Sequence, residues 1–339
     1  MWRRAICLVA MASIVGCSGS GNDGTPKATK PDTSAGPASG GGLNKRIAVV
    51  PKAATHEFWK SVHFGADKAA KELGNVELIW QAPARDDNRD EQVAVVQNLI
   101  TLGVNGICLA PIDSGALVNV VKQTKNAGIP TVIFDSGLND PDLYESYVAT
   151  DNFHGGALAA QEMGKRLGGK GNVILLRYSP GSESTENRER GFLETIKKEF
   201  PDIKILESEQ YAGVTEQSAM TKGQQLLVKF GSDVNGIFAV NESSAAGMLR
   251  ALEQADLAGK IVYIGFDSSD KMVHALKEGK LQGVVLQDPV NMGYKSVMTM
   301  AAVLDGKPVE RKISTGEKVA TKENMDEPEI RRLLNPEQF

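Results

Sequence analysis

Short apolar runs alternate with longer amphipathic segments along most of this chain. The apolar runs are rich in β-branched residues and nearly continuous in apolarity, which is typical of strands buried on both faces of a sheet. A first set of predicted strands is Ile47–Pro51, Val76–Trp80, Gly106–Ala110, Thr131–Phe134 and Tyr147–Thr150, and a second set is Asn172–Leu176, Lys204–Glu207, Gly236–Val240, Ile261–Phe266 and Gly283–Leu286. Apolar residues recur at helical spacing in the segments between them, which predicts helices over His56–Leu73, Arg89–Leu102, Glu186–Phe200 and Thr215–Phe230.

This alternation predicts an α/β fold in which parallel sheets carry helices on both faces. The strands are too many for one sheet of ordinary width, so we interpret the two sets as two similar doubly wound lobes. A closed eight-stranded barrel built from the same units is the structural alternative.

The N-terminus has the pattern of an export signal. Arg3 and Arg4 precede the apolar run 5–15, which ends in Gly16-Cys17. A cysteine directly after a small residue resembles a bacterial lipobox, so we expect residues 1–16 to be removed and Cys17 to become lipidated. An ordinary secretory signal with a chance cysteine is the alternative. Residues 17–44 are mostly small and polar after Cys17, and they predict a disordered tether to an anchored globule outside the cytoplasm.

Composition and motifs argue against several classes of function. The chain has 339 residues and a net charge of −4, which disfavours a nucleic-acid partner. We expect no cofactor and no metal, because Cys108 is a lone cysteine in an apolar strand and the histidines lack metal-binding spacing. We find no nucleophile–base pair, so we expect no enzyme. The acidic pair Asp86-Asp87 lies in a polar loop and is expected to be exposed to solvent.

Polar and aromatic residues follow the predicted strands. In open α/β sheets, ligands bind beyond the carboxyl ends of strands, so these residues are the candidates for a binding site. Amides, carboxylates and a guanidinium can bind vicinal hydroxyls in pairs, and aromatic rings can cover the apolar face of a sugar. The predicted ligand-binding residues are Lys52, His56, Phe58, Trp59, Asp135, Ser136, Arg188, Asn241, Asp267 and Gln287. Helix capping accounts for some of the other polar residues at strand ends, including Asp151.

At this point the chain resembles a known family. The matching stretches are Ile47-Ala48-Val49-Val50, Phe58-Trp59, Ala149-Thr150-Asp151-Asn152, Arg188-Glu189-Arg190-Gly191-Phe192, Phe238-Ala239-Val240-Asn241-Glu242 and Ile264-Gly265-Phe266-Asp267. In order and spacing these stretches resemble the periplasmic sugar-binding proteins of ABC importers, ribose-binding type. The resemblance implies two lobes joined by a three-strand hinge, with a monosaccharide bound between them. It places residues 45–150 and 288–316 in an N-terminal lobe, and residues 151–287 and 317–339 in a C-terminal lobe.

Some residues depart from the ribose-binding pattern. Lys52 stands where ribose binders have a small polar residue, His56 replaces an asparagine, and Ser136 replaces an arginine. A lysine after the first strand also resembles relatives that bind a furanosyl signal, and it could favour an acidic or phosphorylated sugar. A salt bridge from Lys52 to Asp135 or Asp267 is the alternative to direct ligand contact.

The resemblance therefore implies a lipid-anchored, extracytoplasmic solute-binding protein. We expect it to capture a monosaccharide or related polyol by hinge closure and to deliver it, as a monomer, to an ABC importer permease. The alternative is a sensory receptor subunit, coupled to a membrane kinase or chemoreceptor, for a furanosyl signal or sugar acid.

Overall fold

The strands of this computed structural model form two open sheets with the same strand order. The structure describes residues 45–54 and 56–336, so Cys17, the predicted signal and the tether lie outside the described residues. Within the described residues the orders are β11-β5-β4-β3-β1-β2 and β12-β10-β9-β8-β6-β7, six strands in each sheet. Two separate open sheets exclude the closed barrel.

The first sheet is parallel throughout. Its strands are β1 (Lys45–Val50), β2 (Val76–Trp80), β3 (Gly106–Leu109), β4 (Thr131–Phe134), β5 (Ser146–Ala149) and β11 (Lys312–Ser314). Helices α1 (Glu57–Leu73) and α9 (Pro289–Leu304) pack together against one face. Helices α2 (Arg89–Leu102) and α3 (Val118–Asn126) cover the other face, and a short 3₁₀ helix, Pro141–Leu143, lies beside α3.

The second sheet repeats this plan with one reversed edge strand. Its strands are β6 (Lys170–Leu176), β7 (Asp202–Glu207), β8 (Gly236–Ala239), β9 (Val262–Phe266), β10 (Gly283–Gln287) and β12 (Glu317–Ala320). Strand β12 pairs antiparallel with β10, whereas the other pairs are parallel. Helices α4 (Asn152–Leu167) and α5 (Glu183–Glu199) cover one face of this sheet. Helices α6 (Glu216–Phe230), α7 (Glu242–Gln254), α8 (Asp270–Glu278) and α10 (Pro328–Leu334) cover the other, with a 3₁₀ turn at Gly231–Asp233 after α6.

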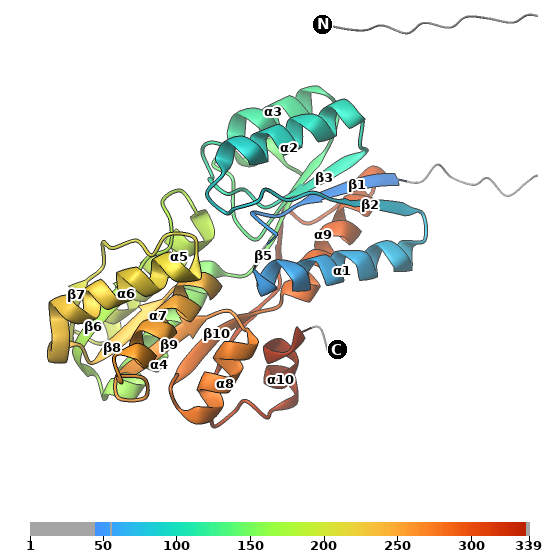
Figure 1. The fold of residues 1–339 in the computed structure, drawn as a ribbon. Helices are drawn as coiled ribbons and strands as arrows, with labels where there is room; N and C mark the ends of the chain where they lie inside the picture. The colour runs from blue at the N-terminus through green and yellow to red at the C-terminus, as the bar shows by residue number, and fades with distance from the viewer. Residues whose placement is uncertain (1–44, 55, 337–339) are drawn as a thin grey trace, which may run out of the picture. The chain divides into compact units, whose positions relative to one another are not determined.

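We call the first sheet with its helices the first lobe and the second sheet with its helices the second lobe (Figure 1). In the described part of the chain, three connections run between the lobes: from β5 to α4, from β10 to α9 and from β11 to β12. Hydrogen bonds join these connections, since the hydroxyl of Thr150 donates to Gln287 Oε1 at 2.7 Å and lies 3.4 Å from the hydroxyl of Thr315. The connections therefore form one bonded bundle that includes Gln287, one of the predicted ligand-binding residues.

Local sequence signals explain where the helices begin and end. Helix α2 begins after Asn88, whose side chain accepts from the backbone N–H of Glu91, and it ends at Gly103, whose φ of 69° is in the left-handed region. Helix α6 begins after its N-cap Thr215, which forms a capping box with Ser218.

The single cysteine in the described residues is buried, as its apolar strand predicts. Cys108 is fully buried in β3, and burial raises the pKa of its thiol, so it is an unreactive core residue.

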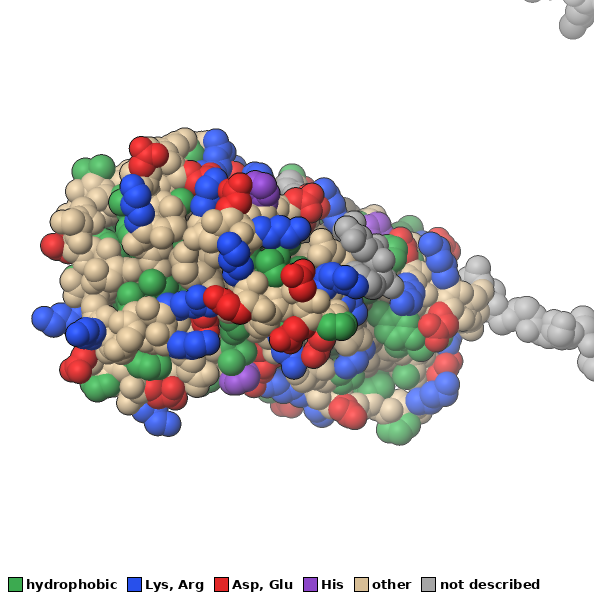
Figure 2. Space-filling model, turned by 90° about the horizontal axis from the view of Figure 1, so that it is seen from below, with side chains coloured by type: hydrophobic (Ala, Val, Ile, Leu, Met, Phe, Trp, Pro, Cys, Tyr) green, Lys and Arg blue, Asp and Glu red, His purple; other side chains and the backbone are tan. Residues whose placement is uncertain are grey.

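The surface carries charges of both signs. On the face seen in Figure 2, acidic and basic side chains are interspersed. Among the described residues no helix has the length and apolarity that a membrane span requires, and no group of His, Cys, Asp or Glu side chains is arranged to hold a metal ion.

Candidate functional site

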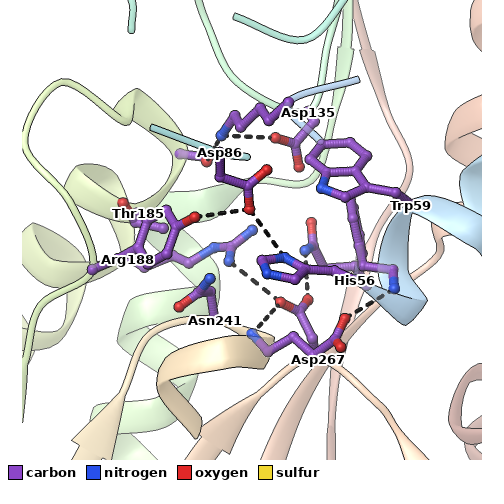
Figure 3. A pocket seen from close by; sticks show the side chains of 14 residues that line it. His56, Trp59, Asp86, Asp135, Thr185, Arg188, Asn241 and Asp267 are labelled. Atoms are coloured by element: carbon purple, nitrogen blue, oxygen red, sulfur yellow. Dashed lines mark hydrogen bonds and ion pairs between the residues drawn. The ribbon is translucent and has the colours of Figure 1, made fainter. Parts of the chain in front are cut away.

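A pocket lies where the carboxyl ends of strands from both sheets meet. It contains about 340 Å³ of empty space, part of which is open to solvent. Fourteen side chains line it (Figure 3): Lys52, His56, Phe58, Trp59, Asp86, Asp135, Tyr178, Ser184, Thr185, Arg188, Asn241, Glu242, Asp267 and Gln287. The structure thus brings together nearly all of the residues that the strand-end argument selects.

Ser136 is the predicted site residue that does not line the pocket. It is fully buried directly behind it, where its hydroxyl accepts from the backbone N–H of Ser184 at 3.2 Å. Ser136 therefore supports the first turn of α5, which carries Ser184, and does not form part of the pocket surface.

The start of α1 supplies an aromatic wall. Phe58 and Trp59 are buried and meet edge to face, with ring centroids 4.8 Å apart. Trp59 also meets Phe134 of β4 edge to face at 6.3 Å, which anchors its ring in the core of the first lobe. The indole Nε1–H of Trp59 has no hydrogen-bond partner among the described residues.

Lys52 forms a buried ion pair and bridges the two lobes. Its Nζ lies 3.1 Å from Asp135 Oδ2, which confirms the salt-bridge alternative of the sequence analysis. The same ammonium donates to the hydroxyls of Ser184 at 3.1 Å and Ser182 at 3.4 Å, which belong to the second lobe. The charge of Lys52 is therefore balanced within the protein.

Arg188 is fixed on α5 by contacts on every side. Its guanidinium donates to Asn152 Oδ1 at 2.8 Å and to the carbonyl of Val240 at 3.0 Å, and it lies 3.9 Å from Asp267 Oδ2. It also stacks over the Phe266 ring at 3.8 Å. This cation is fully buried with its charge compensated, so it presents a rigid donor to the pocket.

Asp267 connects the pocket to the bundle between the lobes. It accepts from Gln287 Nε2 at 2.7 Å and from the backbone N–H of Glu242 at 3.0 Å, and Gln287 in turn accepts from Thr150. Burial raises the pKa of Asp267, although Arg188 opposes the shift. Asp267 has a φ of 70°, and Asp135, which follows the equivalent strand of the first lobe, has a φ of 60°. A positive φ strains the backbone of a residue other than glycine. Such strain costs about 1–3 kcal/mol per residue and concentrates at functional sites.

Asp86 corrects the sequence analysis, which expected the acidic pair to be exposed. Asp87 is exposed and pairs with Arg85, but Asp86 is buried. Asp86 Oδ2 accepts from the hydroxyl of Tyr178 at 2.9 Å and lies 3.1 Å from His56 Nδ1, whereas Oδ1 has no partner among the described residues. Burial and the neighbouring Asp86 charge raise the pKa of Tyr178 well above its usual value, so its hydroxyl remains a donor.

Glu242 binds the start of a helix in the opposite lobe. Its carboxylate accepts from the backbone N–H groups of Glu57 at 3.1 Å and Phe58 at 2.9 Å. The N-cap of α1, His56, makes no side-chain capping bond of its own, so Glu242 supplies the cap across the pocket. Burial raises the pKa of Glu242, and His56 opposes this shift.

Four lining residues that the prediction did not select make bonds between the lobes: Asp86, Tyr178, Ser184 and Glu242. Tyr178 follows β6 as Lys52 follows β1, so the strand-end rule could have found it. Asn241, which was selected, also caps α7 by accepting from the backbone N–H of Ser244. Asp151, which was assigned to capping, accepts from the backbone N–H of His154 as expected.

Comparisons with known proteins agree with this geometry. A family model described as a periplasmic binding protein domain matches residues 47–308. The ribose import binding protein of Salmonella typhimurium is 31% identical over 277 residues, which are 82% of this chain and 90% of that protein. The xylitol-binding protein of Mycolicibacterium smegmatis is 30% identical over 262 residues, which are 77% of this chain and 73% of that protein. A solved ABC transporter solute-binding protein from Agrobacterium vitis with bound D-fucose superposes with a TM-score of 0.82 at 36% identity, covering 85% of this chain and 99% of that one.

Proposed function

Because this chain belongs to the periplasmic binding protein domain family, and within it to the ribose-binding type that serves ABC importers, we propose that it captures a neutral monosaccharide or related polyol and delivers it to an ABC importer. The observation that supports this most strongly is that both lobes supply hydroxyl-binding groups to one buried pocket. Asp135 and Trp59 come from the first lobe, and Arg188, Asn241 and Asp267 come from the second.

Charge balance in the pocket supports a neutral ligand. The two strong cations among the described lining residues are already compensated, Lys52 by Asp135 and Arg188 by Asp267 and its other acceptors. A carboxylate or phosphate on the ligand would find no unpaired cation among the described lining residues, and it would face the buried carboxylate of Asp86 and the half-buried carboxylate of Glu242. Burial of an unpaired charge is strongly unfavourable, so we expect sugar acids and sugar phosphates to bind poorly.

Contacts across the pocket support capture by closure of the two lobes. The bonds from Lys52 to Ser184, from Tyr178 to Asp86 and from the Phe58 backbone N–H to Glu242 each join the lobes directly. A ligand that contacts both lobes only when they are closed shifts the population toward that state. We infer that the three connections act as the hinge and divide the chain into lobes of residues 45–150 with 288–316, and 151–287 with 317–339.

The extracytoplasmic location implied by the family agrees with the export pattern at the N-terminus. We propose lipid anchoring through Cys17, which is supported by the sequence alone. In the native host, a Cys17→Ala variant should lose incorporation of a fatty-acid label and leave the membrane fraction. If the variant kept both the fatty-acid label and its place in the membrane fraction, lipid anchoring through Cys17 would be contradicted.

The proposal is tested by calorimetric titration of protein that has been unfolded and refolded to remove any co-purified ligand. The probes are D-ribose, xylitol, D-fucose, D-arabinose, D-galactose, D-galacturonate and D-ribose 5-phosphate. Several hydrogen bonds at about 1 kcal/mol each, with stronger ones to charged partners, predict a Kd of about 1 μM or tighter for at least one neutral probe. We expect the sugar to be recovered unchanged. Binding of no neutral probe, or a preference for the charged ones, would refute the proposal.

Delivery to an importer is a separate part of the proposal. Deletion of the gene should abolish uptake of the bound sugar by the host. If uptake persisted while a response to the sugar was lost, the sensory alternative would be correct instead.

A further inference from the structure

Two buried polar atoms in the pocket have no hydrogen-bond partner among the described residues. They are Asp86 Oδ1 and the indole nitrogen Nε1 of Trp59, whose residues are only 5% and 4% exposed. Buried polar groups in native proteins are almost always paired, because an unpaired one costs about 1–3 kcal/mol. Among the described lining residues, these two are the polar side-chain atoms that are fully shielded from solvent and have no partner, so they mark where a bound molecule can complete the bonding.

The protein holds the Asp86 carboxylate in one orientation. Its other oxygen, Oδ2, accepts from the Tyr178 hydroxyl at 2.9 Å and lies 3.1 Å from His56 Nδ1. With Oδ2 engaged on that side, Oδ1 is directed into the pocket, toward the indole of Trp59 on the facing wall (Figure 3). The ring of Trp59 is fixed by edge-to-face contacts with Phe58 and Phe134.

The two atoms are chemically complementary to a single group. The indole N–H can only donate, and a carboxylate oxygen can only accept. A hydroxyl group accepts one hydrogen bond and donates another, so it satisfies both atoms at once. An ether or carbonyl oxygen would leave Asp86 Oδ1 unpaired, and an ammonium group would leave the Trp59 N–H unpaired.

We propose that Asp86 and Trp59 form a hydroxyl-binding subsite that selects ligands carrying a hydroxyl at this position. This inference rests on the proposed function and adds to it a specificity-determining pair from the first lobe. Tyr178 comes from the second lobe, so Asp86 is oriented for this contact only when the lobes are together. Recognition of this hydroxyl is thereby coupled to closure.

The test combines protein variants with altered ligands. The probes are the neutral sugar or polyol that binds tightest in the titration above and its complete set of monodeoxy analogues. Trp59→Phe keeps the aromatic ring and removes the N–H. Asp86→Asn keeps the shape, but with its oxygen held by Tyr178 and His56 it turns an NH₂ donor toward the pocket. Each variant should bind the parent sugar about 10-fold more weakly.

One monodeoxy analogue should bind the wild-type protein about 10- to 100-fold more weakly than its parent. We call the ratio of the Kd of an analogue to the Kd of the parent sugar the penalty of that analogue. For the one affected analogue, the penalty should largely disappear in W59F and D86N, because the protein group that bonds the missing hydroxyl is gone. Each penalty is a ratio measured within one variant, so a general loss of stability cancels. A purely structural role for either residue would leave the ratios unchanged.

Matched controls exist in the same chain. Asp87→Asn changes the exposed neighbour of Asp86, and Trp80→Phe changes a tryptophan that stacks on His63 away from the pocket. Both should bind the parent sugar and all analogues as the wild type does. The inference is wrong if W59F and D86N bind the parent sugar normally, or if each analogue keeps its wild-type penalty in both variants. Binding of no neutral probe by the wild type would overturn the proposed function and this inference together.

Discussion

Glu242 offers the sharpest test of closure, because it caps a helix that belongs to the other lobe. Its carboxylate accepts two backbone N–H groups at the start of α1, where His56 provides no side-chain cap. In an open form these N–H groups would be hydrated and the carboxylate would return to water. A Glu242→Ala variant therefore weakens the closed form and leaves each lobe intact.

The magnitude follows from the bonds that are lost. Loss of an N-cap acceptor costs about 0.5–2 kcal/mol, and the burial that raises the pKa of Glu242 offsets part of the gain from its charge. We take about 1–2 kcal/mol as the loss of closing free energy, which is a factor of about 5 to 30 in the equilibrium between open and closed forms. Since sugar binding must supply the closing free energy, Kd should rise by the same factor.

The assay measures two quantities on one sample. Titration should give the raised Kd, and small-angle X-ray scattering at a sugar concentration between the two Kd values should give a larger radius of gyration for E242A than for the wild type. The factor should be equal for every sugar that binds, because closure is common to all of them. Glu57→Ala is the control, since this exposed residue lies in the same turn of α1 but its side chain pairs with Lys60 within the first lobe. An unchanged Kd, or a factor that differs between sugars, would refute the reasoning.

The remaining predictions concern the interior of the pocket and of the second lobe. Lys52→Met leaves the buried Asp135 carboxylate without its cation and should lower the free energy of unfolding by about 3–5 kcal/mol in urea titrations; a loss under about 1 kcal/mol would contradict this. Burial raises the pKa of Glu189 to about 7 against the pull of Arg177, so the folded protein holds this proton more tightly than the unfolded chain does. The resulting stability is fully present below about pH 4.5 and is lost as pH rises through about 7, a decline of about 3 kcal/mol that Glu189→Gln should flatten. If the free energy of unfolding of the Glu189→Gln variant fell with rising pH as steeply as that of the wild type, the assignment of this pH dependence to Glu189 would be refuted. In Gly156→Ala the added Cβ would lie 2.0 Å from the backbone carbonyl oxygen of Arg188, so the variant should lose about 1–3 kcal/mol of stability together with sugar affinity; wild-type melting and binding would refute the packing argument.

The alternation of apolar and amphipathic segments predicted the two-lobe fold, because buried parallel strands are marked by continuous apolar runs. Strands β2 and β4 and helix α2 have the bounds that the pattern predicts. The edge strands β11 and β12 were missed, since they are short and largely polar and carry no such signal. Helix α5 begins three residues before its predicted start, at Glu183 instead of Glu186, because the added first turn is polar.

The candidate site could be predicted where position along a strand determines position in space. The strand-end rule selected residues of both lobes that line one pocket, Asp135 and Asp267 among them. It could not distinguish Asp86 from Asp87, because adjacent carboxylates in a polar loop look alike until the second lobe covers one of them. Glu242 directly follows the selected residue Asn241, but its contact with α1 depends on how the lobes meet, which no local pattern encodes.

The repeat of one plan in two lobes explains why binding and closure are a single event. Equivalent strands β4 and β9 are each followed directly by an aspartate with positive φ, so each lobe presents one strained carboxylate to the pocket. The cation beside Asp135 also bonds Ser184 of the other lobe, and Asp267 is bonded to Gln287, which joins the connections between the lobes. Neither lobe alone therefore holds a complete set of hydroxyl-binding groups in a fixed orientation. A ligand that engages both sets stabilises the closed form by the difference between its contacts in the two forms, and this difference limits how far the population shifts.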